Sequence, residues 1–393
     1  MVIDKIDRLY KYKPTPFYCY DIAEVIRSIE HLKSALPERV HLFYSIKANP
    51  NHKIIATMIR NGLGVEVSSI GELQLALKIG CSPDHIIFSG PGKTKEALRL
   101  AVETRIKCIH VETFLEIQYI ENISCACNIR TDISLRINPL QNVSKSGIKM
   151  TGLSSQFGFD EESLQFALNE MHRFQHIRLI GIHIYHGTQI LNYEDIIAHT
   201  RVTLDYIERI EQHGYTITYV NMGGGFGVPY FISDHELNLT ALKEALDKLF
   251  DEYKGSLSDK QIVYESGRFL VATAGCFITK ILYKKNSYGK IYLICDGGSN
   301  FHVNTAFLGR RVRDNFPVSV IQQHTKNEKE VVTITGPLCT PTDILAQDVN
   351  LPICQEGDYI VVEKSGAYGL TNSPILFISH PKAREIVVAT ARK

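Results

Sequence analysis

The stretch Phe43-Tyr44-Ser45-Ile46-Lys47-Ala48-Asn49-Pro50 combines a strand pattern with a turn. Apolar and aromatic residues run up to Lys47, and Asn49-Pro50 favours a turn directly after it, which predicts a buried strand that ends at a lysine. Most lysines at strand ends are solvated surface charges. Partial burial beside Phe43 and Tyr44 would instead favour the neutral amine, the form that condenses with an aldehyde. Lys47 is therefore a candidate chemical centre that needs support from the rest of the chain.

Short apolar segments of this kind recur along the first two thirds of the chain. Eight of them are predicted as buried strands, at residues 41–48, 64–69, 85–90, 108–113, 132–139, 178–187, 218–225 and 261–266. Helical spacing of apolar residues separates them, for example at 70–78, 95–102, 194–212 and 239–253. Strands that alternate with helices in this way predict an α/β fold, a closed (β/α)8 barrel of the TIM type.

A barrel of this type carries its chemistry at the carboxyl ends of the strands. Those ends are rich in polar groups here. In chain order they are Lys47, Glu66 with Ser68, Gly90-Pro-Gly-Lys93, Glu112, Arg136 with Asn138, His183-Ile-Tyr-His186, Gly223-Gly-Gly225 and Glu265 with Arg268. Their convergence on one face predicts a site there.

The pattern changes after about residue 268 to short strands without long helices between them. These strands are predicted at 276–283, 290–295, 331–335, 358–363 and 385–388. They indicate a C-terminal antiparallel β domain, and the strand-like segment 15–20 is expected to join it. The predicted division is a barrel over residues 22–268 and a β domain over 1–21 and 269–393.

Composition excludes several classes of protein. The 393 residues carry a net charge of +1 with no basic stripe, so a nucleic acid partner is not expected. No apolar run approaches the roughly 20 residues of a membrane span, and the N-terminus does not look like a signal peptide, so a cytoplasmic protein is expected. The nine cysteines lack framework spacing, and Cys125-Ala-Cys127 lacks a second ligand pair, so no metal site is predicted.

Two motifs at strand ends suggest an anionic ligand. Gly223-Gly-Gly-Phe-Gly227 is either a tight turn or a phosphate cradle of backbone N–H groups, and Val228 breaks the dinucleotide fingerprint. Glu265-Ser-Gly-Arg268 is either a surface ion pair or a site where a carboxylate holds a proton on a pyridine ring and an arginine grips an anion. His183 and Tyr185 share one strand face and either fill the core or stack on a cofactor ring.

Together these motifs closely resemble the fold type III pyridoxal phosphate decarboxylases, the family of the diaminopimelate, ornithine and arginine decarboxylases. The resemblance covers nearly the whole chain. Its motifs, in family order, are YSIKAN at 44–49, EVSSIGEL at 66–73, GGGFG at 223–227, ESGR at 265–268, GPLCTPTD at 336–343 and GAYG at 366–369.

The resemblance implies pyridoxal 5'-phosphate as cofactor, linked through its aldehyde to Lys47, with Glu265 on the ring nitrogen. Further cofactor positions implied by the family are Glu66, Arg136, His183, Tyr185, Thr188, Gly223, Gly224, Gly225, Gly267, Arg268 and Tyr368. It also implies that Cys339 donates a proton, that Thr340, Asp343, Arg268 and Tyr368 meet the substrate, and that a homodimer shares its active sites.

Three departures from the diaminopimelate pattern bear on the substrate. Tyr185 stands at the ring-stacking histidine, Thr340 replaces the acid that recognises a distal amine, and the segment through Arg310-Arg311 lacks an arginine-proline pair. A threonine hydroxyl cannot supply the charge-assisted bond that an ammonium group requires.

A subgroup with larger substrates fits these departures better. Ser146-Gly-Ile-Lys-Met150 and Ser379-His-Pro381 also resemble decarboxylases of carrier-protein-tethered glutamate, of exopolysaccharide pathways and of siderophore citryl-diaminopropionate. Alternatives are diaminopimelate decarboxylase itself, a racemase on the same barrel, which Cys339 with Asp343 argues against, and a non-catalytic regulatory homologue, which should have lost Lys47 or Cys339.

Overall fold

The computed structural model describes residues 14–139, 154–306, 314–322 and 328–388. Its contacts divide the chain into two compact units. The barrel unit comprises residues 28–228 and 235–269, and the β unit comprises the described residues up to 27, residues 229–234 and those from 270 onward. Two segments that bear on the substrate, Ser146–Met150 and Arg310-Arg311, lie outside the described residues.

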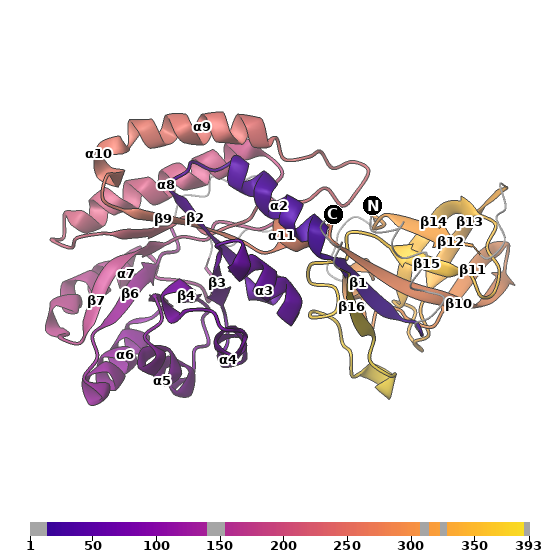
Figure 1. Ribbon diagram of the computed structural model, residues 1–393, viewed down its shortest axis with the longest axis horizontal. Helices are drawn as coiled ribbons and strands as arrows, with labels where there is room; N and C mark the ends of the chain where they lie inside the picture. The colour runs from indigo at the N-terminus through magenta and orange to yellow at the C-terminus, as the bar shows by residue number, and fades with distance from the viewer. Residues whose placement is uncertain (1–13, 140–153, 307–313, 323–327, 389–393) are drawn as a thin grey trace. The chain divides into compact units, whose positions relative to one another are not determined.

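Eight parallel strands close the barrel, as the sequence predicts (Figure 1). They are β2 (Val40–Ser45), β3 (Gly64–Val67), β4 (Ile86–Phe88), β5 (Cys108–Val111), β6 (Thr131–Arg136), β7 (Ile177–His183), β8 (Tyr219–Asn221) and β9 (Gln261–Ser266). Closure comes from the pairing of β2 with β9. Their interior is a packed core that includes Phe43, Ile87 and Val263.

Helices follow the strands, and their starts are fixed by caps. The helices are α2 (Ile22–Ser34), α3 (His52–Arg60), α4 (Ile70–Ile79), α5 (Lys95–Thr104), α6 (Phe114–Cys127), α7 (Glu161–Glu170), α8 (Tyr193–Glu211), α9 (Leu239–Glu252), α10 (Lys254–Leu257) and α11 (Arg268–Val271). Ser69, Thr94 and Thr113 each accept a hydrogen bond from a backbone N–H in the first helical turn. Such caps end each strand-to-helix loop at a defined residue and hold the loop in place.

The β unit contains β1 (Phe17–Asp21), β10 (Gly275–Ser287), β11 (Lys290–Cys295), β12 (Val318–Ile321), β13 (Lys329–Thr335), β14 (Ile344–Pro352), β15 (Tyr359–Val362) and β16 (Arg384–Val388). The N-terminal strand joins this sheet, as predicted, because β1 pairs with β10.

The predicted β domain is therefore confirmed, but its sheet is mixed and not wholly antiparallel. Strand β11 pairs in parallel with β13, and β1 in parallel with β16. Parallel neighbours need a long crossover, and long stretches of chain separate both pairs. Among the described helices, none is long and apolar enough to cross a membrane.

Candidate active site

Lys47 lies just past the carboxyl end of β2, in the single 3-10 turn Ile46–Ala48. The predicted strand over 41–48 is therefore too long by the turn that carries the lysine. Lys47 Nζ lies 2.8 Å and 3.0 Å from the two carboxylate oxygens of Glu66. The lysine side chain is 41% exposed, whereas that of Glu66 is 0% exposed. A cation that solvent can reach is thus fixed by a buried anion.

Glu66 is held in its ionised form by this contact. Burial alone would raise the pKa of Glu66, but the charge and hydrogen bonds of Lys47, together with hydrogen bonds from Ser45 and Ser68, outweigh burial and lower that pKa.

Glu265, on β9, points into the same barrel end, and its pKa is shifted in the opposite direction from that of Glu66. Its Oε1 accepts a hydrogen bond of 2.8 Å from Asn221 Nδ2 and lies 3.6 Å from His183 Nε2. Burial and the negative charge of Glu66 raise the pKa of Glu265 to about 7. Two buried carboxyl groups in one barrel therefore differ in proton affinity, because Lys47 contacts Glu66 directly.

Two buried histidines, His110 of β5 and His183 of β7, have tilted rings in contact, with an interplanar angle of 46°. The rings of His110 and His183 lie 4.4 Å apart between centroids, and burial lowers the pKa of His110 to about 3 and that of His183 well below its ordinary value. Both rings are therefore neutral at physiological pH. With Glu265 they form a group of metal-ligating type. His110 already bonds Ser134 and Asn221 through its two nitrogens, so the group does not offer three free ligand atoms.

Asn221 and His110 are site residues that sequence reasoning missed. Asn221 donates to Glu265 and accepts a hydrogen bond of 2.9 Å from Gly223 N, so it joins the carboxylate of β9 to the turn after β8. The available signal was a polar residue at the carboxyl end of a short buried strand, as in Tyr219-Val-Asn221.

The glycine run after β8 forms the turn that the sequence predicts. Gly223 and Gly225 have φ values of +68° and +112°, which residues with a side chain rarely adopt. A Cβ on Gly224 would lie 2.3 Å from the backbone oxygen of Glu265, and one on Gly225 would lie 2.6 Å from that of Gly187. Strand β9, the loop after β7 and the turn after β8 therefore approach one another closely at this barrel end, and only glycine permits it.

Tyr185, Thr188, Gly267 and Arg268 belong to the same barrel end. Burial raises the pKa of Tyr185, while the charges of Lys47 and Arg268 and a hydrogen bond with Thr188 oppose that rise. Gly267 is required because a Cβ there would lie 2.9 Å from the Cβ of Ala48, next to Lys47. The predicted strand over 178–187 ends earlier, at His183, so Tyr185 lies in the loop that follows β7.

Arg136 is brought to the barrel end but is already paired. Its Nη1 lies 2.8 Å from Glu112 Oε1, and both side chains are almost completely buried. Glu112 also accepts hydrogen bonds from the backbone N–H groups of Gly90 and Gly158. This ion pair ties three strand-end loops together, which makes it a support for the barrel mouth.

Four predicted residues belong to the β unit. Cys339 is exposed, and Thr340 lies beside it in the loop between β13 and β14. Asp343 is buried, and its two oxygens accept hydrogen bonds from Ser299 N at 2.6 Å and Leu338 N at 2.7 Å. The carboxylate of Asp343 therefore shapes the loop that presents Cys339. Tyr368 has a φ of +57°, and its carbonyl accepts a hydrogen bond from Asn304.

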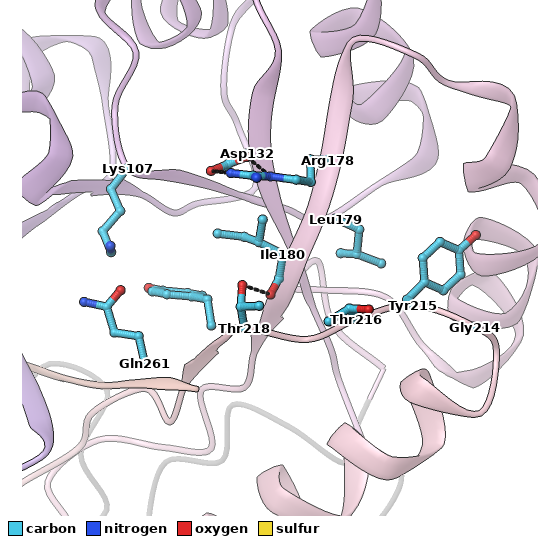
Figure 2. A pocket seen from close by; sticks show the side chains of 11 residues that line it. Lys107, Asp132, Arg178, Leu179, Ile180, Gly214, Tyr215, Thr216, Thr218 and Gln261 are labelled. Carbon is cyan, nitrogen blue, oxygen red and sulfur yellow. Dashed lines mark hydrogen bonds and ion pairs between the residues drawn. The ribbon is translucent and has the colours of Figure 1, made fainter. Parts of the chain in front are cut away.

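The opposite end of the barrel contains a separate cavity of about 550 Å³ (Figure 2). It is lined at the amino ends of the strands by residues that include Lys107, Thr218 and Gln261. Arg178 and Asp132 form a bidentate pair there, with both distances 2.7 Å. None of the predicted site residues lines this cavity.

Comparison with known proteins agrees with this geometry. Residues 22–272 match the family of pyridoxal-dependent decarboxylases, by its pyridoxal binding domain. The chain is 39% identical to an L-glutamyl-[BtrI acyl-carrier protein] decarboxylase of Niallia circulans, over 98% of this chain and 91% of that protein. It is 31% identical to the 2-[(L-alanin-3-ylcarbamoyl)methyl]-2-hydroxybutanedioate decarboxylase of Staphylococcus aureus, over 97% and 96%.

A solved structure extends the similarity to the whole fold. Diaminopimelate decarboxylase from Helicobacter pylori, in complex with L-lysine, has a TM-score of 0.87 and 29% identity, and the match covers 97% of this chain and 93% of that one.

Proposed function

The chain belongs to the family of pyridoxal-dependent decarboxylases, and from that membership we propose that its substrate is an amino acid tethered to an acyl carrier protein. Decarboxylation at the α-carbon needs a free α-amine and a free α-carboxylate. The tether must therefore be on the side chain, and a glutamyl group linked through its side-chain carboxyl satisfies that need.

The barrel residues fit pyridoxal phosphate. Lys47 contacts Glu66 directly, and the buried carboxyl group of Glu265 has no cation as close to it among the described residues. A protonated pyridine nitrogen is therefore a suitable partner for Glu265. The glycine turn at 223–225 brings backbone rather than side chains to the barrel end, which suits a phosphate. Lys47 is partly exposed beside both features.

Pyridoxal phosphate, when bound, supplies an aldehyde that condenses with amines and a protonated ring that accepts the electrons left when CO₂ departs. In this proposal Lys47 would hold the cofactor through its aldehyde. Glu265 keeps the ring nitrogen protonated, while Arg268 and Tyr368 hold an anionic group. His183 and Tyr185 would be the ring-bearing side chains beside the cofactor.

The α-carbon must regain a proton after CO₂ leaves, and we assign that proton to Cys339. Its thiol is exposed on a loop that Asp343 holds in shape. Because Cys339 lies in the β unit and Lys47 in the barrel unit, we also propose a homodimer that completes each site from two chains. The nine free cysteines support a reducing compartment, the cytoplasm.

Thr340 is the residue that favours a tethered substrate over free diaminopimelate. A distal ammonium group needs an acid beside it, and the residue that follows Cys339 is neutral. Diaminopimelate decarboxylase remains the second candidate because the Helicobacter pylori enzyme shares the whole fold.

The test is CO₂ release by the cofactor-loaded protein from two substrates, a glutamyl-loaded acyl carrier protein and free meso-diaminopimelate. We expect release from the first and little from the second. Lys47→Ala should abolish release, and borohydride reduction should attach pyridoxal phosphate to Lys47 in the wild type but not in the variant. Rapid release from free diaminopimelate would show that Thr340 has been misread, and full activity of Lys47→Ala would refute the scheme.

A further inference from the structure

The β unit carries a groove of about 470 Å³ on one face of strands β11, β13 and β14. Because β11 pairs in parallel with β13, Tyr292 lies beside Thr333 and Ile294 beside Thr335. Leu293, which alternates with them, is completely buried. The strands therefore turn one face to the core of the unit and the other into the groove.

One end of the groove lies beside Cys339. Strand β13 ends at Thr335, and the loop that follows carries Cys339 before returning as β14 from Ile344. Thr340 and Pro341, which come directly after Cys339, line the groove. A chain lying in the groove would therefore reach the residue to which we assign the proton transfer.

The walls near this end are neutral. Tyr292 and Ile294 offer apolar surface, and Thr335 and Thr340 offer hydroxyl groups. Asp343 also lines the groove, but it is buried and both of its oxygens accept backbone hydrogen bonds. Such walls suit a neutral chain with amide groups and do not suit an ammonium group.

The other end of the groove carries Lys290, which has Asp348 beside it. Lys290 begins β11 and lies four residues before Ile294, which is about 13 Å along a strand. Lys285 of β10 pairs with Tyr292 and so shares this face. Lys290 Nζ ends 3.9 Å from Asp348, beyond hydrogen-bonding distance, and both side chains are more than half exposed. Its ammonium group is therefore paired only loosely with Asp348, and an anion would compete with that aspartate for it.

We propose that this groove holds the phosphopantetheine arm of the carrier protein, with the amide-containing chain along Tyr292 and Ile294 and the phosphate beside Lys290. The inference rests on the proposed function and adds to it the surface that recognises the tether. The enzyme would then recognise the substrate through the phosphopantetheine arm. The neutral loop at Thr340 would leave room for that arm and would not repel it.

The test compares γ-glutamyl thioesters of phosphopantetheine and of pantetheine, which lacks the phosphate. Wild-type protein should show a KM about fivefold lower for the phosphorylated thioester, the effect of one exposed charge pair. Lys290→Glu should abolish that preference by raising KM for the phosphorylated thioester alone. Asp348→Asn should enlarge the preference. The control is Lys243→Glu on α9, where an exposed lysine also has an aspartate neighbour, and it should keep the preference.

Each result supports or overturns the proposal that the groove binds the phosphopantetheine arm. An unchanged preference in Lys290→Glu overturns it, and if that variant does not fold, an unchanged preference in Asp348→Asn does the same. A weakened dimer in sedimentation with an unchanged preference means that a second copy covers this face, which also overturns it. If neither thioester is decarboxylated while a free amino acid is, the proposed function fails. Titration of the protein with phosphopantetheine alone then tests whether the groove binds the arm, and an absence of binding overturns that proposal.

Discussion

The fold changes the proton affinity of Glu265 in a way that a stability measurement can detect. Burial and the charge of Glu66 raise its pKa from an ordinary value of 4.5 to about 7. An acid with a raised pKa in the folded state binds its proton more tightly there than in the unfolded chain. The folded protein therefore loses stability as pH rises from about 4.5 to about 7, and a shift of this size corresponds to about 3 kcal/mol.

We expect Glu265→Gln to remove this loss of stability at high pH. In the cofactor-free protein the variant should have a free energy of unfolding higher than wild type by about 2–3 kcal/mol at pH 8 and by less than about 1 kcal/mol at pH 5. Urea unfolding at the two pH values measures this. CO₂ release should fall by about 100-fold or more, because an amide has no charge to hold a ring proton. A variant that is less stable than wild type at pH 8 would contradict this account of Glu265.

The sequence predicts some residues of the barrel end and hides others. Lys47, Glu66 and Glu265 are polar residues at the ends of apolar segments, so the order of strands and helices is enough to bring them to one face of a barrel. His110 is the third residue of β5 and Asn221 the last residue of β8, so their positions along the strands do not set them apart from Glu66 and Glu265. Which polar residue of a strand points inward depends on register and on how each barrel layer is filled, and both are set by contacts between distant segments.

At the scale of the elements, the turn that follows β8 depends on glycine. Gly224→Ala would place a Cβ 2.3 Å from the backbone oxygen of Glu265, so strand β9 or the turn must move. We expect a loss of about 1–3 kcal/mol in stability and at least a tenfold weaker affinity for pyridoxal phosphate, followed by absorbance titration. Gly255→Ala in α10 is the control, since a Cβ there meets nothing within 4 Å. Equal cofactor affinity in both variants would remove the turn from the cofactor site.

Strand and helix bounds show where a local pattern stops being informative. The helices predicted at 70–78 and 239–253 agree closely with α4 and α9, whose apolar spacing and caps are local signals. The strands predicted at 41–48 and 218–225 run beyond β2 and β8, because chain continuing into the barrel mouth still carries aromatic or apolar residues. β14 was missed, since Asp348 and Asn350 lower its apparent strand preference.

At the scale of the whole molecule, the alternation of strands and helices is enough to predict the barrel, but not the sheet of the β unit. A (β/α)8 barrel repeats one local unit, so each strand pairs with its neighbours in sequence. In the β unit, β1 pairs with β16 from the other end of the described chain. No local pattern specifies such a partner, so a mixed sheet was predicted as antiparallel.

The proposal that each site takes residues from both units gives the last prediction. Lys47→Ala and Cys339→Ala should each be nearly inactive as pure proteins. If each site takes Lys47 from one chain and Cys339 from the other, mixing the two variants after dissociation makes heterodimers with one intact site. Random pairing gives half heterodimers, so activity should recover to roughly a quarter of wild type. Each variant treated alone in the same way is the control. No recovery, with heterodimers shown by differently sized tags, would place both residues of a working site on one chain.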